Sequence, residues 1–328
     1  MEQENRRPWR RWVVLVLLIA GFILGGIFVP VQPEILVAPE RLIEEPIVEN
    51  FLGFGPLYLV NTIPTLVITI ILLGVIAFFA NRSLTQSAQT DLVPRGIGNL
   101  VEAILEMIYN LTEGSAGAKW AKAIFPWFAT ILIYVLFANL LKLIPGFESI
   151  GVLHESHGEG GHHIEPLFGQ WYLFTHDEGD YILAPFLRGI SVDLNFTFAL
   201  AMISVVMIQV IGFRAQGWGY ISKFFNTRRM FKVPFFGAMD FLVGLLELIS
   251  ELSKILSFAF RLFGNMFAGI VLVAIVAGLL GRFSILPAMV MMFELFVGVI
   301  QAFVFGMLTM VFMAQATQGH GEEHAESH

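Results

Sequence analysis

The sequence contains no cysteine and few charged residues, and both absences narrow the classes of protein that it can encode. Without cysteine, disulfides, thiolate nucleophiles, zinc–cysteine sites and iron–sulfur clusters are excluded. Only 14% of the 328 residues are charged, against about 25% in soluble domains, whereas 56% are hydrophobic. The mean hydropathy is +0.75. The chain is therefore predicted to be an integral membrane protein, and its net charge of −7 argues against nucleic-acid binding.

The histidines are confined to polar stretches of the chain. All eight histidines lie in two polar stretches, at His154, His157, His162, His163 and His176 and at His320, His324 and His328. Proton chemistry inside the apolar segments must therefore use carboxylates, arginine, lysine or neutral polar groups.

Six segments without charged residues divide the chain: 13–33, 51–81, 123–141, 194–213, 262–281 and 295–321. A helix needs about 20 apolar residues to cross a hydrocarbon core. Backbone groups in lipid must be satisfied within their own segment, and the alternation typical of a membrane barrel is missing. We therefore predict an all-α, polytopic membrane protein with about six hydrophobic segments.

The basic residues predict the orientation. The connections 1–12, 82–122 and 214–232 carry four, four and five of them, whereas the alternate connections carry one, two and one. By the positive-inside rule, both termini lie in the cytoplasm. Segment 13–33 is read as an uncleaved anchor; if it were instead a cleaved signal sequence, the N-terminus would lie outside.

Three regions follow along the chain. Residues 1–49 form an N-terminal tail, the extra anchor and an outer segment. Residues 50–318 form the membrane domain, which includes an outer loop, 146–192, rich in histidine and acidic residues. Residues 319–328 form a tail that we expect to be disordered.

Residues 97–113 are typical of an amphipathic helix. Ile104, Ile108 and Leu111 share one face, and Glu102 and Glu106 lie away from it. The pattern fits a helix at the membrane surface and equally a helix packed on other subunits or loops.

The last third of the chain contains two unusually long apolar stretches. Met239–Gly281 spans 43 residues and Ser284–Gln318 spans 35, or about 65 Å and about 52 Å if helical. Both exceed the membrane thickness, so the helices must be strongly tilted or broken. Residues 281–287 contain glycine and proline and predict a turn, which makes the two helices a hairpin.

A polar stripe runs along the first of these helices. At 100° per residue, five polar residues share an arc of about 80°: Glu247, Glu251, Lys254, Arg261 and Asn265. A purely structural alternative is that Glu247, Glu251 and Lys254 form a neutralised network near the cytoplasmic interface, and it fits Glu247 less well than the other two. Arg261 stays charged at any accessible pH and has no carboxylate within one turn, so its partner must belong to another helix or another chain.

The block from Arg261 to Gly269, Arg-Leu-Phe-Gly-Asn-Met-Phe-Ala-Gly, resembles the a subunit of F-type ATP synthases, the stator half of the proton channel. Weaker matches are Asn139-Leu140-Leu141 with Pro145-Gly146, the segment 193–197, and the segment 301–305. The matches cover about residues 50–318 in the order and spacing of the family.

The resemblance implies a non-catalytic, proton-translocating subunit in a bacterial-type plasma membrane, without a cofactor or metal. Its expected partners are the c-subunit rotor ring, which carries the membrane-embedded carboxylate, b-type peripheral-stalk subunits and the rest of the F-type ATP synthase. Protons are taken as the coupling ion, although sodium selectivity would be set largely by the ring. By motif position, Arg261 is the essential stator arginine. The outer half-channel is expected at Asn265, Glu294, Gln301 and Asp193, and the cytoplasmic half-channel at Glu247 and Ser250, with Ser257 one turn from the arginine.

Two positions depart from the family pattern. Many members have a glutamate where this chain has Ile270, and a histidine where it has Glu294. We hypothesise that one titratable group has moved between the two helices. Lys142, where a small residue is common, is a further departure without a functional explanation.

Two other function classes fit the sequence less well. A self-contained secondary ion transporter would need a substrate site, often between repeated halves, and no internal repeat is visible. An intramembrane hydrolase would need a nucleophile and base or metal ligands at membrane depth.

The outer loop 146–192 is expected to be a solvated loop. Weaker alternatives are that it contacts another subunit or buffers protons near the channel mouth, or that it binds a metal.

Overall fold

The computed structural model describes residues 38–43, 45–50, 53, 55–89, 96–144, 147–155, 162–168, 171–221, 224, 234–280 and 286–318, together with Trp12 and Val16. The predicted anchor 13–33, apart from Val16, and the predicted tail 319–328 lie outside the described residues.

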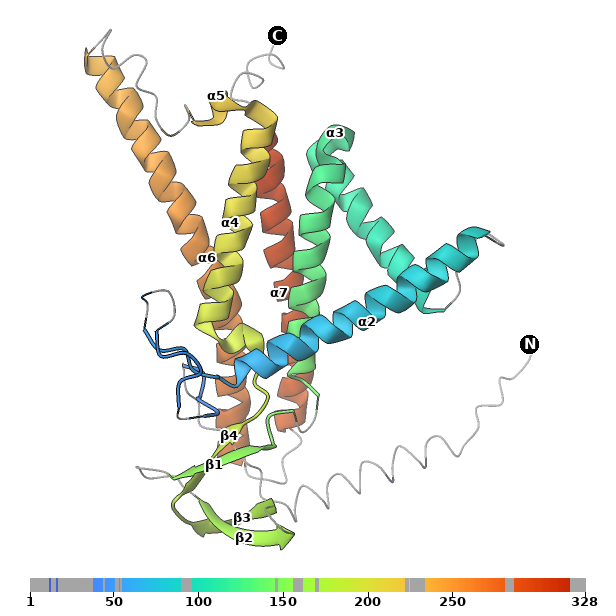
Figure 1. The fold of residues 1–328 in the computed structure, drawn as a ribbon, viewed down its shortest axis with the longest axis vertical. Helices are drawn as coiled ribbons and strands as arrows, with labels where there is room; N and C mark the ends of the chain where they lie inside the picture. Colours follow the sequence, from blue (N-terminus) through green and yellow to red (C-terminus); the bar gives the residue numbers. More distant parts are fainter. Residues whose placement is uncertain are drawn as a thin grey trace.

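Long helices make up most of the described chain (Figure 1). They are α2 (Thr62–Gln89), α3 (Ile97–Leu141), α4 (Leu194–Gln216), α6 (Pro234–Leu280) and α7 (Leu286–Thr317), with a short α5 (Trp218–Ile221) and a 3-10 turn, η1 (Ile190–Val192). Each of the five long helices contains a stretch long and apolar enough to cross a membrane. The predicted polytopic, mainly helical fold is confirmed, although the helix expected within 51–81 begins only at Thr62.

Helix α3 joins two predicted segments, 97–113 and 123–141, in one element of 45 residues. Its axis turns at Gly117, where φ is +72° and ψ is +158°. This backbone region is readily accessible only to glycine. Ile108, on the first half, is fully buried in a cluster that also contains Phe128 of the second half. The first half therefore contributes to the same buried cluster as the second half at that point.

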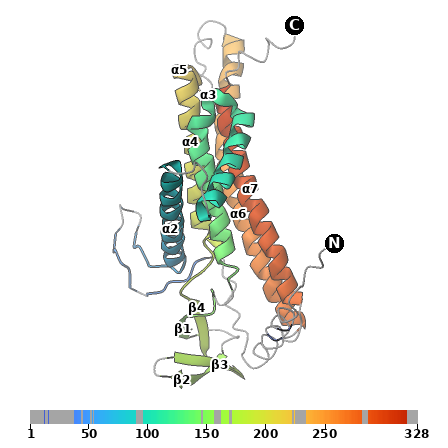
Figure 2. The ribbon, with the colours of Figure 1, turned by 90° about the vertical axis from the view of Figure 1, so that its right-hand side faces the viewer.

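Helices α6 and α7 form the predicted hairpin. They contain 47 and 32 residues, or about 70 Å and about 48 Å of helix. The lower parts of α6 and α7 lie side by side in Figures 1 and 2. Helix α6 is inclined to α4, so that the upper ends of α6 and α4 diverge (Figure 1). Both helices are therefore long and continuous rather than broken.

The outer loop 146–192 differs from its prediction. In place of a solvated loop, the structure contains a four-stranded antiparallel sheet in the order β1-β4-β2-β3. Its strands are β1 (Gly151–Glu155), β2 (His162–Phe168), β3 (Trp171–Glu178) and β4 (Tyr181–Pro185). Apolar residues occur in each of these strands and favour extended structure. In β4, Leu183 and Ala184 are buried. The sheet lies beyond one end of the helices, which we call the sheet end (Figure 1).

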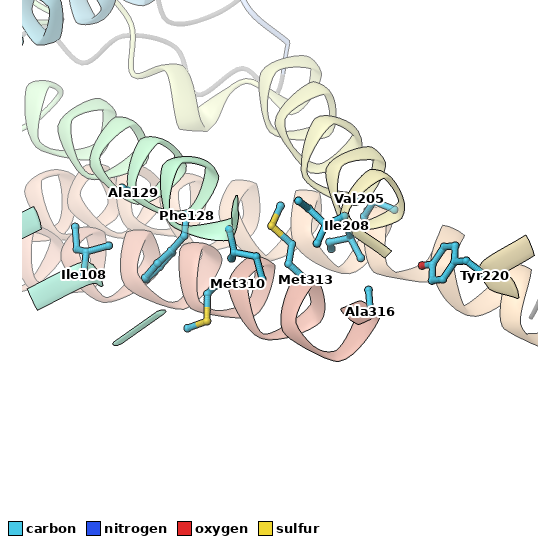
Figure 3. Packing of buried hydrophobic residues seen from close by; sticks show 11 residues of the cluster. Ile108, Phe128, Ala129, Val205, Ile208, Tyr220, Met310, Met313 and Ala316 are labelled. Carbon is cyan, nitrogen blue, oxygen red and sulfur yellow. The ribbon is translucent and has the colours of Figure 1, made fainter. Parts of the chain in front are cut away.

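The core lies where α7 packs between α3 and α4. Figure 3 shows the buried cluster, in which Met310 and Met313 of α7 meet Phe128 of α3 and Ile208 of α4. A second buried cluster extends to α6 through Phe258, Leu262 and Met266. The four helices therefore form one apolar unit, and α6 and α7 are held in a defined relation to α3 and α4.

The close approach of α3 and α7 gives a stability prediction. A Cβ atom added at Gly306 would lie 3.0 Å from Leu132 Cβ and 3.0 Å from Phe128 Cε2. We expect Gly306→Val to destabilise the protein by about 1–3 kcal/mol through overpacking. Thermal denaturation of the detergent-purified protein measures this. Gly74→Val is the matched control, since open space surrounds Gly74 on α2; equal denaturation temperatures for both variants would contradict the prediction.

Candidate functional site

Arg261 lies on a face of α6 that the described part of the chain leaves uncovered. Its guanidinium is exposed, and Nη2 donates a long hydrogen bond of 3.5 Å to Ser257 Oγ, one turn away. No carboxylate among the described residues pairs with it. The adjacent Phe260 is 54% exposed. Only 11% of the most apolar stretch of α6 is buried within the chain, against 39% for α3, α4 and α7. The partner of Arg261 is therefore not supplied by the described part of this chain.

Asn265 and Gln301 connect α6 to α7. Asn265 Nδ2 donates a 2.6 Å hydrogen bond to Gln301 Oε1. Nearby on α7, the Gly298 carbonyl accepts a 3.0 Å hydrogen bond from Asn139 Nδ2 of α3. Gln301 Nε2 and Asn139 Oδ1 are buried without a partner among the described residues. Buried amide groups require partners, so both atoms are able to bind water in the contact between the three helices.

Glu294 is buried and paired with Lys142 of α3. The Lys142 ammonium contacts Glu294 Oε1, and it also lies 3.5 Å from the Met266 carbonyl oxygen of α6. The side chains of Lys142 and Glu294 are 3% and 7% exposed. A Cβ atom at Gly269 would lie 2.5 Å from Glu294 Oε1. The Glu294 carboxylate therefore lies against α6 directly before Ile270, which supports the hypothesis that it takes over the place of a carboxylate on α6.

The Asp193 carboxylate accepts hydrogen bonds from residues of both α4 and α2. Its Oδ1 accepts a 2.9 Å hydrogen bond from the Asn195 backbone N–H and caps α4, and its Oδ2 accepts a 2.9 Å hydrogen bond from Thr62 Oγ1. Neither interaction joins it to Glu294 or Gln301. Asp193 therefore links the start of α4 to the start of α2, and it makes no hydrogen bond with the other predicted outer residues among those described.

A second polar cluster lies on α6 on the other side of Arg261. Glu251 Oε1 accepts a 2.7 Å hydrogen bond from Lys254 Nζ, and Glu251 Oε2 accepts a 2.8 Å hydrogen bond from Gln209 Nε2 of α4. The Tyr220 hydroxyl donates to Gln209 Oε1 at 2.8 Å. The pKa of Tyr220 is raised to about 12, mainly by burial and to a smaller extent by the charges of Glu251 and Glu247. The ion pair between Glu251 and Lys254 fits their alternative interpretation as members of a neutralised network.

A pocket of about 380 Å³ opens beside this cluster, with Gln209, Tyr220 and Glu251 in its wall. Glu247 is half-buried and Ser250 is exposed, each within one turn of Glu251 on α6. Neither of these predicted residues lines the pocket, although both lie close to Glu251 along the helix.

The three groups of polar residues are ordered along α6. Gly269, which contacts Glu294, is eight residues from Arg261, or about 12 Å of helix. Glu251 is ten residues away in the opposite direction, or about 15 Å. Arg261 thus lies between two separate polar clusters, and it is the member without an ionic partner in the described chain.

Sequence reasoning missed Lys142, Asn139 and Gln209 as members of these clusters. The sequence shows Lys142 as an unusual lysine beside one apolar segment and Glu294 as a carboxylate beside another. Their contact could not be predicted, because 152 residues separate them in the sequence. No group of three potential metal ligands occurs in the described residues, and part of the outer loop 146–192 lies outside them.

The space at Gly269 yields a prediction about the Glu294 pair. We expect Gly269→Ala to displace the Glu294 carboxylate from Lys142 and to lower the stability by about 1–3 kcal/mol, because a buried charge loses its partner. Thermal denaturation measures the loss, and Gly278→Ala on the same helix, in open space, is the control. In a Glu294→Ala background the Gly269→Ala change should cost nothing further; an equal cost in both backgrounds would refute the explanation.

Comparisons with known proteins identify the family of this chain. A model of the family "ATP synthase A chain" matches residues 63–314. ATP synthase subunit a of Campylobacter jejuni strain 81-176 is 31% identical over 253 residues, which are 75% of this chain and 86% of the relative. ATP synthase subunit a of Moorella thermoacetica is 30% identical over 267 residues, which are 81% and 94% of the two chains. This chain belongs to the ATP synthase A chain family.

Proposed function

We propose that this chain is the stator subunit in the membrane sector of an F-type ATP synthase. It forms two offset proton half-channels against a rotating ring of c subunits and couples proton translocation to ATP synthesis or hydrolysis, without a catalytic centre of its own. The observation that carries the proposal is the position of Arg261: exposed, without an ionic partner in the described chain, and between two polar clusters on α6.

The partner of Arg261 is a carboxylate on each ring subunit. A charge facing lipid costs at least about 2.5–3.5 kcal/mol, so an exposed arginine among apolar side chains needs a partner outside the chain. A fixed guanidinium favours the ionised form of a carboxylate that passes it. Each ring carboxylate therefore arrives at Arg261 without its proton and leaves again to collect one.

Arg261 also separates the two half-channels. A permanent positive charge repels a proton that would pass directly from one polar cluster to the other. Each elementary charge that crosses the membrane yields about 2.3 kcal/mol per 100 mV, and a leak at Arg261 would dissipate this energy. Protons are instead forced to travel on the ring.

The outer half-channel comprises Glu294, Gln301 and Asn265, with Asp193 near its mouth. Its support is the chain of polar groups at the α3–α6–α7 contact, which includes a buried carboxylate and two buried amide atoms without a partner among the described residues. Such groups can accept and pass protons through bound water.

The cytoplasmic half-channel comprises Glu247 and Ser250 and ends near Ser257. Its support is the pocket beside Glu251 and the position of Ser257 against the Arg261 guanidinium. The remaining assembly follows from the same function: b-type peripheral-stalk subunits hold the chain still against the ring, in a bacterial-type plasma membrane with both termini in the cytoplasm.

Replacement of Arg261 tests the proposal. We expect Arg261→Gln to abolish ATP-driven acidification of membrane vesicles while the complex still assembles, because the ring carboxylate loses its counter-charge. After removal of the ATPase sector, the passive proton leak should rise, because the barrier between the half-channels is gone.

Arg82→Gln is the matched control, since Arg82 is an exposed arginine on α2, outside both polar clusters. It should pump at the unaltered rate. Unaltered pumping by Arg261→Gln would overturn the proposal and would favour a transporter that works without a ring.

A further inference from the structure

Lys142 lies in one of the most enclosed charged positions among the described residues. It follows the last residue of α3, and its side chain is 3% exposed. Its ammonium group contacts the Glu294 carboxylate and the Met266 carbonyl, which belong to α7 and α6. One side chain from α3 therefore reaches the contact between the two helices that carry the outer polar residues.

Two glycines shape the space around this pair. A Cβ atom at Gly189 would lie 3.2 Å from Lys142 Cδ, so this glycine admits the aliphatic part of the lysine. A Cβ atom at Gly269 would lie 2.5 Å from Glu294 Oε1, so this glycine admits the carboxylate. The pair thus occupies a closely fitted space, and the Glu294 carboxylate cannot turn toward α6 more closely than it does.

Such a pair is a poor source of stability alone. Removing two charges from water costs several kcal/mol per ion, and an apolar pair of the same volume is often as stable. Breaking one half of the pair is nevertheless costly, because the other charge stays buried. A buried lysine beside a carboxylate that accepts protons is therefore better explained by its effect on that carboxylate.

Other charged groups lie close to this pair. The charges of Lys142, Arg188 and Glu294 all act on Glu148. Burial raises the pKa of Glu148, and the charge of Glu294 adds to that rise, while a hydrogen bond from Gly189 N–H at 3.1 Å and the charges of Lys142 and Arg188 oppose it. Lys142 is the cation in direct contact with Glu294, and Arg261 is the nearest cation on α6, about 12 Å of helix from Gly269.

We propose that Lys142 is a positioning residue for proton transfer: it holds the Glu294 carboxylate against Gly269 and sets the pH range over which Glu294 exchanges protons in the outer half-channel. The inference rests on the proposed function. It explains why a lysine and a glutamate occur together in one chain, on helices that meet only in the folded protein.

The test uses vesicles that contain the whole ATP synthase, with Lys142→Met, Lys142→Arg, Glu294→Gln and the double variant Lys142→Met/Glu294→Gln. ATP-driven acidification is measured over a range of pH, next to the amount of assembled complex. Without the lysine, a buried carboxylate keeps its proton to higher pH. We expect the pH of half-maximal pumping in Lys142→Met to rise by about one unit, and Lys142→Arg to keep the original profile.

The double variant separates this function from mere packing. We expect it to pump at least as well as Glu294→Gln, because the lysine is no longer left buried without a partner. Lys122→Met, at an exposed lysine on the same helix, controls for the loss of one positive charge. If Lys142→Met fails to assemble, recovery of the complex in the double variant supports the inference, since it shows that the fault is an unpaired charge.

Three results would overturn the inference: an unchanged pH profile in assembled Lys142→Met, losses that simply add in the double variant, or a double variant that fails to assemble. Each leaves the proposed function standing if Arg261→Gln abolishes pumping. If Arg261→Gln pumps normally, the proposed function itself has failed, so the two failures are distinguishable.

Discussion

A charged side chain among apolar helices must find a partner, and this constraint organises the whole molecule. Lys142 pairs with Glu294, and Lys254 pairs with Glu251, which is also held by Gln209. These contacts join α3 to α7 and α4 to α6, the same helices whose apolar faces form the core. Arg261 is different, because its charge faces outward from the least buried helix. The pairs hold the subunit together, and the arginine is free to act on something else.

The ordering of polar groups along α6 gives the proposed mechanism its geometry. A single continuous helix of 47 residues carries both clusters and the arginine between them, so their separation is set by helical rise. A broken helix would let the clusters approach each other and would weaken the barrier between them. The contacts of α7 with α3 and α4 hold α7 in place, and α6 packs against α7 and α4. In the proposed mechanism, the fixed position of this helix keeps the two proton paths apart.

Much of the fold could be predicted from hydropathy alone. The long apolar stretches in the last third became α6 and α7, and the arginine block marked the helix that carries the site. Prediction failed where structure depends on pairing between distant segments. The strands in the outer loop pair across up to 34 residues, from Gly151 to Pro185, and local composition suggested only a polar loop. Likewise, the segments 97–113 and 123–141 looked separate in the sequence but form one helix with a kink at Gly117.

The same distinction applies to the site. Arg261, Asn265, Glu294 and Gln301 could be found in the sequence, because a charged or amide group in an apolar helix is rare and its motif is specific. The partner of each group was not visible, since no periodicity relates α3 to α7. The sequence by itself determined a membrane protein with a family motif and an arginine that needed a partner. Only the tertiary structure decided that Lys142 neutralises Glu294 and that Arg261 has no carboxylate partner in the described chain, because charge pairing depends on which helices meet in space.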